Sequence, residues 1–171
     1  MLSRGKTMKR IPLTRGKFAL VDDRDYEELS RFKWHTMFSP TNGNFYAARD
    51  GRNLARDKGR YVVMHRQILG ICDRNISVDH KNHNGLDNRK SNLRVCTASQ
   101  NMMNRRGAQK NSTTGWRGVY IDKRNPIRKF YSEIRAGKKK IFLGYFKTVS
   151  EARRAYASAN RKYYGEFGGG F

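Results

Sequence analysis

The densest group of polar side chains in the sequence lies between residues 78 and 104. Its potential metal ligands and hydrogen-bonding groups are Asp79, His80, His83, Asn88, Asn92, Asn101 and Asn104. His80 is the candidate general base, because an imidazole titrates close to neutral pH. The carboxylate of Asp79 and the amide oxygen of Asn101 are hard ligands that suit Mg²⁺ and leave it open positions for water and phosphate. These residue types predict metal-assisted hydrolysis of a phosphodiester.

Asp79 and His80 are neighbours in a predicted strand over residues 76–80. Successive side chains of a strand point to opposite faces, so the two can share a site only if the strand bends or ends there. An Asn-rich loop alone is more typical of turns. For Asp79, His80 and Asn101 we favour catalysis over a structural role, because three residue types and two spacings agree with the chemistry.

The charge balance indicates the partner. The 171 residues contain 37 Lys and Arg against 14 Asp and Glu, a formal net charge of +23, and both halves of the chain are basic. Such a field favours nucleic acid as the partner, with a ribosomal or merely basic protein as the alternative. The length allows one or two small domains and excludes a large enzyme.

Other classes of protein are disfavoured by what the sequence lacks. No stretch has enough apolar residues to span a bilayer, and the basic segment 1–10 is not followed by an apolar signal region, so we expect a cytoplasmic protein without a membrane partner. Cys72 and Cys96 have no C-x-x-C partner, which argues against a disulfide framework and a four-ligand zinc site.

Residues 11–64 are expected to form short strands around one helix. The predicted strands cover 17–21, 45–47 and 61–64, and Asp22 and Asp23 are expected to cap a helix that presents Tyr26, Leu29 and Phe32 at helical spacing. Trp34 is expected to close this small cluster. The charged stretch 49–60 is either a solvated surface or a loop over DNA.

Around the polar cluster the predicted order is strand, loop, strand and helix. The strands cover 76–80 and 93–96, and the T-x-x-Q spacing of Thr97 and Gln100 predicts a helix over about 98–105. Residues 107–114 have one alanine and no larger apolar side chain, which predicts a linker.

Beyond the linker, hydrophobic alternation predicts three antiparallel strands, over 118–122, 129–136 and 139–146, packed on a helix capped by Ser150. The uncovered face of that sheet is expected to present Tyr120, Tyr131, Glu133, Arg135, Lys140 and Phe142. This mixture of cations, aromatic rings and hydrogen-bonding groups could enter a major groove.

The segment around Asp79 and His80 resembles the HNH nuclease motif of phage-type homing endonucleases, whose fold is two strands and a helix around one metal ion. The resemblance implies that Asp79 and Asn101 bind one Mg²⁺ or Mn²⁺ and that His80 is the base. It implies that Asn92 fixes the loop presenting His80 through backbone hydrogen bonds, with Asn88 a weaker candidate for that role. Residues 64–70 resemble a segment common in phage HNH proteins, in which His65 braces the site or approaches phosphate. Phosphate contacts are also expected from Arg89, Arg94, Arg105 and Arg106, although Arg94 could equally form a structural ion pair.

Residues 111–171 resemble an Apetala/ethylene-response-factor DNA-binding domain. The similarity is carried by Gly115-Trp116-Arg117-Gly118-Val119, Glu133-Ile134-Arg135, Leu143-Gly144-Tyr145-Phe146, Glu151-Ala152 and Ala155-Tyr156. It implies DNA contacts from Arg117, Glu133, Arg135 and Lys140, and we add Tyr131 from the same face. Tyr120 and Asp122 depart from the family pattern, which has arginines there, so the family's base preference cannot be transferred.

Together these features predict an α+β DNA endonuclease that acts on double-stranded DNA, needs no small-molecule cofactor and is a monomer or weak dimer. The predicted parts are an N-terminal β-rich extension (1–64), an HNH core (65–106), a linker (107–114) and a DNA-binding domain (115–171). The predicted reaction is nicking or double-strand cutting, of the homing type, in the bacterial host cytoplasm if a phage encodes the protein. The alternative is a noncatalytic, sequence-specific DNA-binding regulator on a decayed HNH scaffold.

Overall fold

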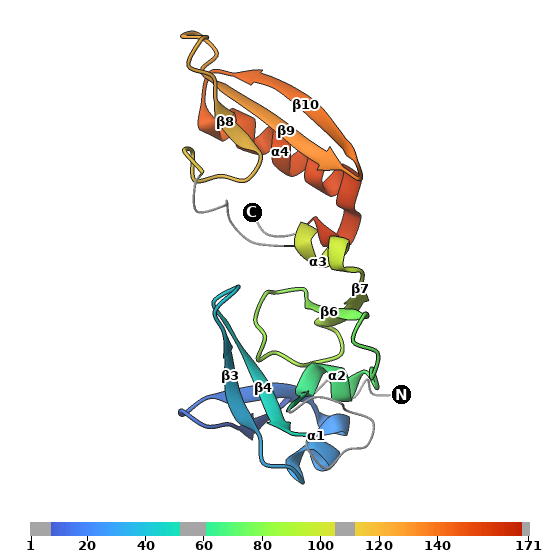
Figure 1. Cartoon of the computed structure of the whole chain (residues 1–171). Coiled ribbons are helices and arrows are strands. Elements are labelled where there is room, and N and C mark those ends of the chain that lie inside the picture. Colours follow the sequence, from blue (N-terminus) through green and yellow to red (C-terminus); the bar gives the residue numbers. More distant parts are fainter. Residues whose placement is uncertain (1–7, 52–60, 105–111, 169–171) are drawn as a thin grey trace, which may run out of the picture. The chain divides into compact units, whose positions relative to one another are not determined.

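The computed structural model describes residues 8–51, 61–104 and 112–168. The chain divides into two compact units, Met1–Ala98 and Ser99–Phe171, referred to below as the N-terminal and C-terminal units. The architecture is mixed α+β, with several small antiparallel sheets and few helices in the described residues (Figure 1). The predicted residues Arg105 and Arg106, and residues 107–111 of the predicted linker, lie outside the described part of the chain.

The N-terminal unit begins with two small sheets and a helix. Strands β1 (Met8–Pro12) and β2 (Phe18–Asp22) form an antiparallel hairpin, followed by α1 (Asp23–Ser30). Strands β3 (His35–Ser39), β4 (Asn44–Asp50) and β5 (Tyr61–Val63) form an antiparallel sheet with β4 in the middle. The predicted strand over 61–64 is one residue too long, because Met64 begins α2 (Met64–Ile68).

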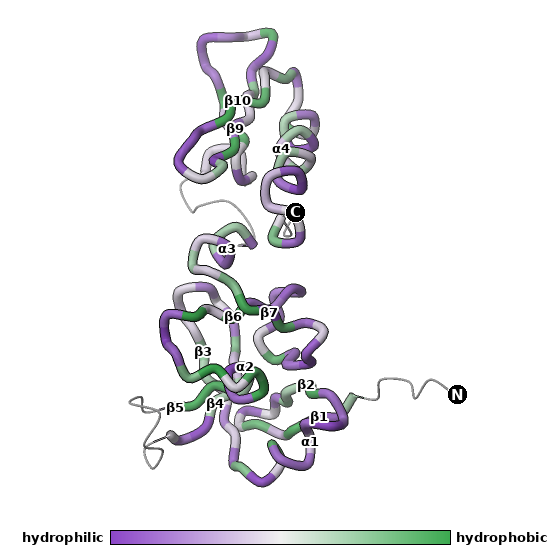
Figure 2. The backbone as a smooth tube through the Cα atoms, turned by 90° about the vertical axis from the view of Figure 1, so that its right-hand side faces the viewer, coloured by the Kyte–Doolittle hydropathy of each residue, from purple (hydrophilic) through white to green (hydrophobic). Residues whose placement is uncertain are grey.

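One hydrophobic core joins these elements. Its buried members are Ile11, Leu13, Ala19, Val21, Leu29, Trp34, Ala47 and Met64. The indole nitrogen of Trp34 donates a hydrogen bond to the carbonyl oxygen of Leu29 at 2.8 Å, so the expected closure of the α1 cluster by Trp34 is confirmed. The α1 segment itself is coloured mainly hydrophilic in Figure 2, in keeping with its single fully buried residue, Leu29.

The N-terminus of α1 corrects the expected cap. The helix begins at Asp23 with Asp22 in the N-cap position, but the Asp22 side chain makes no capping hydrogen bond. Its carboxylate instead accepts a hydrogen bond from the backbone nitrogen of Lys90, at 2.8 Å. A carboxylate forms a strong, charge-assisted hydrogen bond with this part-buried amide. The negative charges of Asp23 and Asp25 remain in the first turn of the helix, where they stabilise its N-terminus.

The polar cluster follows on a two-stranded sheet. Strand β6 (Ser77–His80) pairs antiparallel with β7 (Leu93–Cys96), and α3 (Ala98–Met103) follows. The expected order of strand, loop, strand and helix is therefore confirmed. In the register, Asp79 faces Arg94 and His80 faces Leu93.

The C-terminal unit has the expected sheet and helix. Strands β8 (Val119–Ile121), β9 (Phe130–Ala136) and β10 (Lys139–Phe146) form an antiparallel sheet with β9 in the middle, and α4 (Val149–Tyr164) covers one face of it (Figure 1). The short 3₁₀ helix η1 (Gly165–Phe167) follows α4. Ile134, Tyr156 and Ala159 are buried between sheet and helix, with Ile141, Leu143 and Tyr164 packed against them. Along α4 the tube in Figure 2 changes repeatedly between hydrophilic and hydrophobic colours, as expected of a helix with one apolar face.

The cap of α4 differs from the prediction. Thr148, rather than Ser150, is the N-cap, and its side chain accepts a hydrogen bond from the backbone nitrogen of Glu151. The Glu151 carboxylate in turn accepts from the backbone nitrogen of Thr148 at 3.3 Å. This reciprocal pair satisfies two backbone donors, which a cap at Ser150 could not do because no Glu or Gln lies three residues after it. In the part of the chain that the structure describes, no helix is long and apolar enough to cross a membrane.

Candidate active site

His80 ends the strand that carries the polar cluster. Strand β6 stops at His80, and both Asp79 and His80 are buried, at 7% and 5% exposure. Because the strand ends at His80, the side chains of Asp79 and His80 need not point to opposite faces of a sheet. The two side chains nevertheless have separate surroundings, because Asp79 faces Arg94 while His80 lies among the rings of His65 and Tyr46.

The imidazole of His80 is held beside a buried amide. Its Nε2 atom lies 3.3 Å from Oδ1 of Asn88, a residue with no exposed surface. Burial lowers the pKa of His80, and the hydrogen bond that its ring donates to Asn88 and the charge of Asp79 only partly oppose that shift. The ring is therefore neutral at physiological pH, which is the state that a general base requires.

Three rings meet at this point. The His65 ring, from α2, lies 5.0 Å from the His80 ring, edge to face, and the Tyr46 ring of β4 is 5.9 Å from each of them. The His65 Nδ1 atom is buried and has no hydrogen-bond partner among the described residues. Burial, with smaller contributions from His80 and Arg66, lowers the pKa of His65 to about 3. His65 is thus a neutral side chain that packs against His80, rather than an exposed one.

The low pKa of His65 predicts a pH-dependent stability. In the unfolded chain a histidine becomes charged below about pH 6.5, whereas in the folded unit His65 stays neutral down to about pH 3. The unfolded state therefore binds the extra proton, and stability falls as the pH drops through this window. From about pH 7.5 to about pH 5 the loss due to His65 is about 2 kcal/mol.

Urea unfolding of the chain and of a His65→Phe variant, at both pH values, measures this contribution. The variant keeps an aromatic ring and loses the titrating group, so its decrease in unfolding free energy should be smaller by about 2 kcal/mol. Equal decreases in the two proteins would show that His65 is protonated in the folded state.

The loop between β6 and β7 is fixed by side-chain hydrogen bonds. Asn92 accepts a hydrogen bond from the backbone nitrogen of Asn82 at 3.0 Å and donates one to the carbonyl oxygen of Asp87 at 2.7 Å. These are bonds of the kind that the HNH resemblance implies for Asn92. Asp87, at 2% exposure, accepts from Asn82 and from two nitrogens of Arg89. Burial alone would raise the pKa of Asp87, but the hydrogen bonds and charge of Arg89 and the bond from Asn82 hold it below its usual value.

The same loop is attached to the first hairpin of the chain. The backbone nitrogen of Leu20 in β2 donates to the carbonyl oxygen of Leu86, and the backbone nitrogen of Asn88 donates to the carbonyl oxygen of Leu20, both at 2.8 Å. The side chain of Lys90 also forms a salt bridge with Asp25, at 2.7 Å. Segments far apart in the sequence thus position Asn88, the partner of His80.

Strand β4 holds the other side of the loop. The side-chain nitrogen of Asn44 donates to the carbonyl oxygen of His83 at 2.7 Å, and its oxygen accepts from the backbone nitrogen of Gly85. A Cβ atom at Gly85 would overlap the carbonyl oxygen of Phe45 and lie 2.7 Å from the ring of Tyr46. His83, one of the polar residues singled out in the sequence, has a positive φ of 63° at this turn. Asn44 and Tyr46 were not predicted, since no local pattern in the sequence relates β4 to a loop almost 40 residues away.

Asp79, the predicted metal ligand, forms a buried ion pair. The Nε and Nη2 atoms of Arg94 lie 2.8 and 2.6 Å from Oδ2 of Asp79, and both side chains are 8% exposed. The two residues face each other on neighbouring strands β6 and β7. In this structure Arg94 therefore forms the structural ion pair that the sequence analysis gave as the alternative to a phosphate contact. Among the described residues, no three His, Cys, Asp or Glu side chains gather as a metal site. A metal ion bound by Asp79 would take its other ligands from amide, water or phosphate oxygens, and such oxygen donors fit Mg²⁺.

The other predicted ligand belongs to the other unit. Asn101 lies on α3, and the division between the units falls before Ser99. The ligand pair of Asp79 and Asn101 therefore stays a prediction.

The residues expected to contact DNA in the C-terminal unit have varied surroundings. Arg117 donates to the carbonyl oxygens of Met102 and Met103, at 3.3 and 3.0 Å, and so satisfies acceptors at the end of α3. Lys140 forms a salt bridge with Glu133 at 3.1 Å, while Arg135 is exposed. The ring of Tyr131 stacks on that of Tyr120, with 5.1 Å between centroids. Asp122 pairs with Arg124, which offsets the negative charge that would oppose a phosphate.

Comparison with known proteins bears on the residues around the polar cluster. Residues 60–103 match a family model described as HNH endonuclease. A protein of Acanthamoeba polyphaga mimivirus, named as an uncharacterized HNH endonuclease, is 32% identical over 110 residues, which cover 61% of this chain and 48% of the relative. The chain therefore spans about half the length of this curated relative. No solved structure gives a significant match. The matched residues 60–103 include the β6–β7 sheet and His80.

Proposed function

We propose that the protein is a metal-dependent DNA endonuclease of the homing type, in which the HNH domain hydrolyses phosphodiester bonds and the C-terminal unit binds the DNA target. The observation that carries this proposal is the neutral, buried imidazole of His80, held by Asn88 at the end of β6 within the HNH match. The excess of basic residues supplies the attraction for duplex DNA.

His80 acts as the base that removes a proton from the attacking water. Its ring is oriented by Asn88 on one side and by His65 and Tyr46 on the others, so little motion is needed before the proton is transferred. Asn92 and Asp87 keep the loop that carries Asn88 in place. Once protonated, the imidazolium is stabilised by the charges of Asp79 and Asp87, which both favour the charged form of His80.

One Mg²⁺ or Mn²⁺ ion per site, held by Asp79 and Asn101, would supply stabilisation of the charge that develops on the scissile phosphate and the leaving 3′ oxygen. A metal ion would compete with Arg94 for Asp79, because Arg94 pairs with the same carboxylate. Arg94 then either shares the carboxylate or turns toward a phosphate of the substrate.

The remaining parts of the proposal concern the assembly. The protein acts as a monomer or weak dimer in the cytoplasm, that of a bacterial host if a phage encodes it. A single HNH site cuts one strand per encounter, so a double-strand break requires a second copy or a reorientation on the DNA. The C-terminal unit contributes affinity and site selection through its basic sheet face.

Conversion of supercoiled plasmid or phage DNA to open-circle and linear forms tests the proposal. With Mg²⁺ or Mn²⁺ we expect cutting that EDTA prevents and that His80→Ala lowers by about 100-fold or more. Tight DNA binding without cutting, on any DNA including the genomic locus of the protein, would overturn the nuclease and favour the noncatalytic regulator.

The contact between the loop and β4 gives a second prediction. Gly85→Ala forces the loop away from Phe45 and Tyr46, and we expect cleavage to slow by about 10-fold or more because Asn88 and His80 move with the loop. Gly43→Ala is the control, since Gly43 has a φ of +67° in the turn between β3 and β4 and open space at its Cβ position. Both variants should lose about 1–3 kcal/mol of stability, but only Gly85→Ala should slow cleavage at a temperature where both are folded. Equal rates in the two variants would show that the loop does not position His80.

A further inference from the structure

The free face of the C-terminal sheet carries a cluster of four aromatic rings, from Tyr120, Tyr131, Phe142 and Tyr145, that covers no part of the core. The ring centroids of neighbouring pairs are 5.1 to 6.4 Å apart. Tyr120, Phe142 and Tyr145 are 40%, 56% and 41% exposed. Helix α4 packs on the opposite face of the sheet, so it leaves these rings uncovered.

A β-bulge brings the fourth ring into the cluster. Phe142 and Tyr145 are three residues apart on β10 and would point to opposite faces of a regular strand. The register shifts between Phe142 and Gly144, and Gly144 has a φ of +127°. The shift places Tyr145 opposite Tyr131, on the same face as Phe142. Bulges commonly redirect one side chain in this way, and here the result is a larger exposed aromatic surface.

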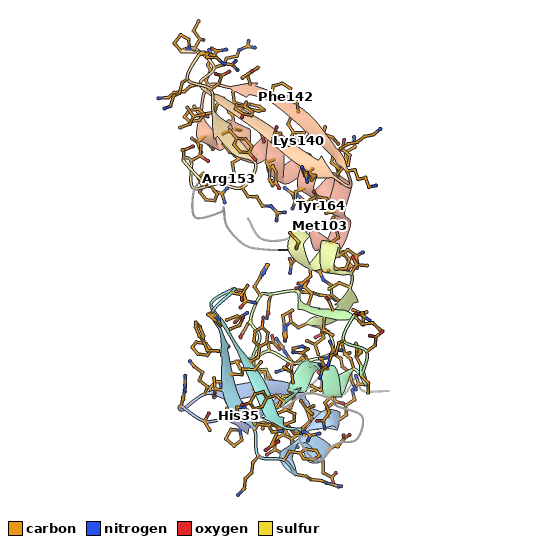
Figure 3. The ribbon with its side chains drawn as sticks, in the orientation of Figure 1. His35, Met103, Lys140, Phe142, Arg153 and Tyr164 are labelled. Atoms are coloured by element: carbon orange, nitrogen blue, oxygen red, sulfur yellow. The ribbon has the colours of Figure 1, made fainter. Side chains whose placement is uncertain are left out.

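Two cations, Arg135 and Lys140, border this aromatic cluster on one side, and Lys140 also pairs with Glu133. In the sheet register, Lys140 lies opposite Arg135 on the free face, next to the row of Phe142 and Glu133. Residues 99–171 contain 17 Lys and Arg against four Asp and Glu. Figure 3 shows Phe142 and Lys140 both projecting from the sheet, whereas Tyr164 belongs to the end of α4. Exposed rings beside cations suit a polyanion that offers flat apolar groups, which is the chemistry of a nucleic acid.

The rings also define the form of the nucleic acid. In an intact duplex the faces of the bases are covered by their neighbours, and a protein reaches only their edges. An aromatic face gains stacking energy only from bases that are unpaired and unstacked. We propose that the aromatic cluster of the C-terminal unit binds single-stranded DNA, by stacking bases on its exposed rings while Arg135 and Lys140 contact phosphates. This goes beyond the duplex binding of the proposed function and does not depend on cleavage.

The test is a binding titration of the full chain in EDTA with a fluorescent oligothymidylate of about 15 nucleotides, compared with a duplex of the same length. The oligothymidylate should bind at least as tightly as the duplex. Phe142→Ala and Tyr145→Ala should each weaken its binding by about 5-fold to 100-fold, and Tyr145→Phe should restore it because the ring is kept. Tyr163→Ala is the matched control, because Tyr163 is also 41% exposed but lies on α4, and it should bind normally.

The salt dependence separates stacking from charge. Removing a ring leaves the number of displaced counterions unchanged, so the slope of log affinity against log salt should be the same in Phe142→Ala as in the parent protein. Arg135→Gln should make that slope less negative by about 0.7, the value for one phosphate contact on a single strand.

Three results would overturn the proposal: a duplex bound tightly with no binding of oligothymidylate, oligothymidylate binding that the ring variants leave unchanged, or a dimer that Phe142→Ala dissociates in sedimentation experiments. The first would leave the proposed duplex binding intact. Failure of plasmid cleavage would leave the single-strand proposal intact, since the titration is done without metal.

Discussion

Asp79→Ala will lower the unfolding free energy of the N-terminal unit by about 3–5 kcal/mol, because it leaves the buried guanidinium of Arg94 without its carboxylate. Loss of cleavage in this variant alone would therefore be ambiguous, since it could reflect unfolding. A second substitution, at Arg94, separates loss of the metal ligand from loss of stability. Asp79→Ala combined with Arg94→Met removes both charges and keeps an apolar side chain of similar length in the position of Arg94.

We expect the double variant to recover most of the lost stability while cleavage stays absent. Urea unfolding and the plasmid assay measure the two quantities separately, and Arg94→Met alone completes the double-mutant cycle. A loss below about 1 kcal/mol in Asp79→Ala would show that the ion pair contributes little, as exposed pairs do. Cleavage by the stable double variant at the parent rate would exclude Asp79 as a metal ligand.

Gly118→Ala will unfold the C-terminal unit. A Cβ atom at this position would overlap the ring of Tyr156, which is 3% exposed, and would lie 2.8 Å from the carbonyl oxygen of Glu133. The backbone cannot move aside easily, because the carbonyl oxygen of Gly118 accepts hydrogen bonds from the Ser132 hydroxyl and the Glu133 nitrogen. Gly118 also has a φ of +68°. We expect a loss above about 4 kcal/mol, at the upper end of single substitutions.

Gly137→Ala is the control for the backbone effect. Gly137 has a similar φ of +60° in the turn between β9 and β10, but nothing lies near its Cβ position, so only about 1–2 kcal/mol should be lost. The chain has two tryptophans, Trp34 in one unit and Trp116 in the other. In a Trp34→Phe background, Trp116 fluorescence follows the C-terminal unit alone. Similar unfolding curves for the two glycine variants would show that the Tyr156 ring moves aside, and that its close packing on Gly118 is not required for the stability of the C-terminal unit.

Hydrophobic periodicity predicted the strands and helices well because the alternation reflects burial directly. In β9, Ser132 and Ile134 are buried while Arg135 is exposed, and β10 has the predicted bounds. The caps were less successful, although the T-x-x-E spacing of Thr148 and Glu151 is a local signal that identifies the actual one. The bulge at Gly144, which adds Tyr145 to the free face, follows from pairing with β9 and has no distinct local pattern.

The sequence predicted which residues belong to the candidate site, but not which other side chains they contact. The motif singled out Asp79, His80 and Asn92, whose spacing is local enough to be read from the sequence. The contacts of His80 with Tyr46 and His65 depend on how distant segments pack. The pairing of Arg89 with Asp87 likewise gives a structural role to a side chain that had been expected to contact phosphate. Whether it also contacts phosphate stays a prediction.

The attachment of the β6–β7 loop to the first hairpin has a consequence for the order of events during synthesis. Asp22 and the backbone nitrogen of Lys90 that it accepts from are 68 residues apart. A ribosome releases the N-terminus first, so β1, β2 and α1 are outside the exit tunnel well before the loop emerges. Contacts of such long range form slowly. The nascent chain can therefore complete the surroundings of His80 only in a late step, and a chain released before Lys90 is made would lack both this contact and strand β7, which pairs with β6.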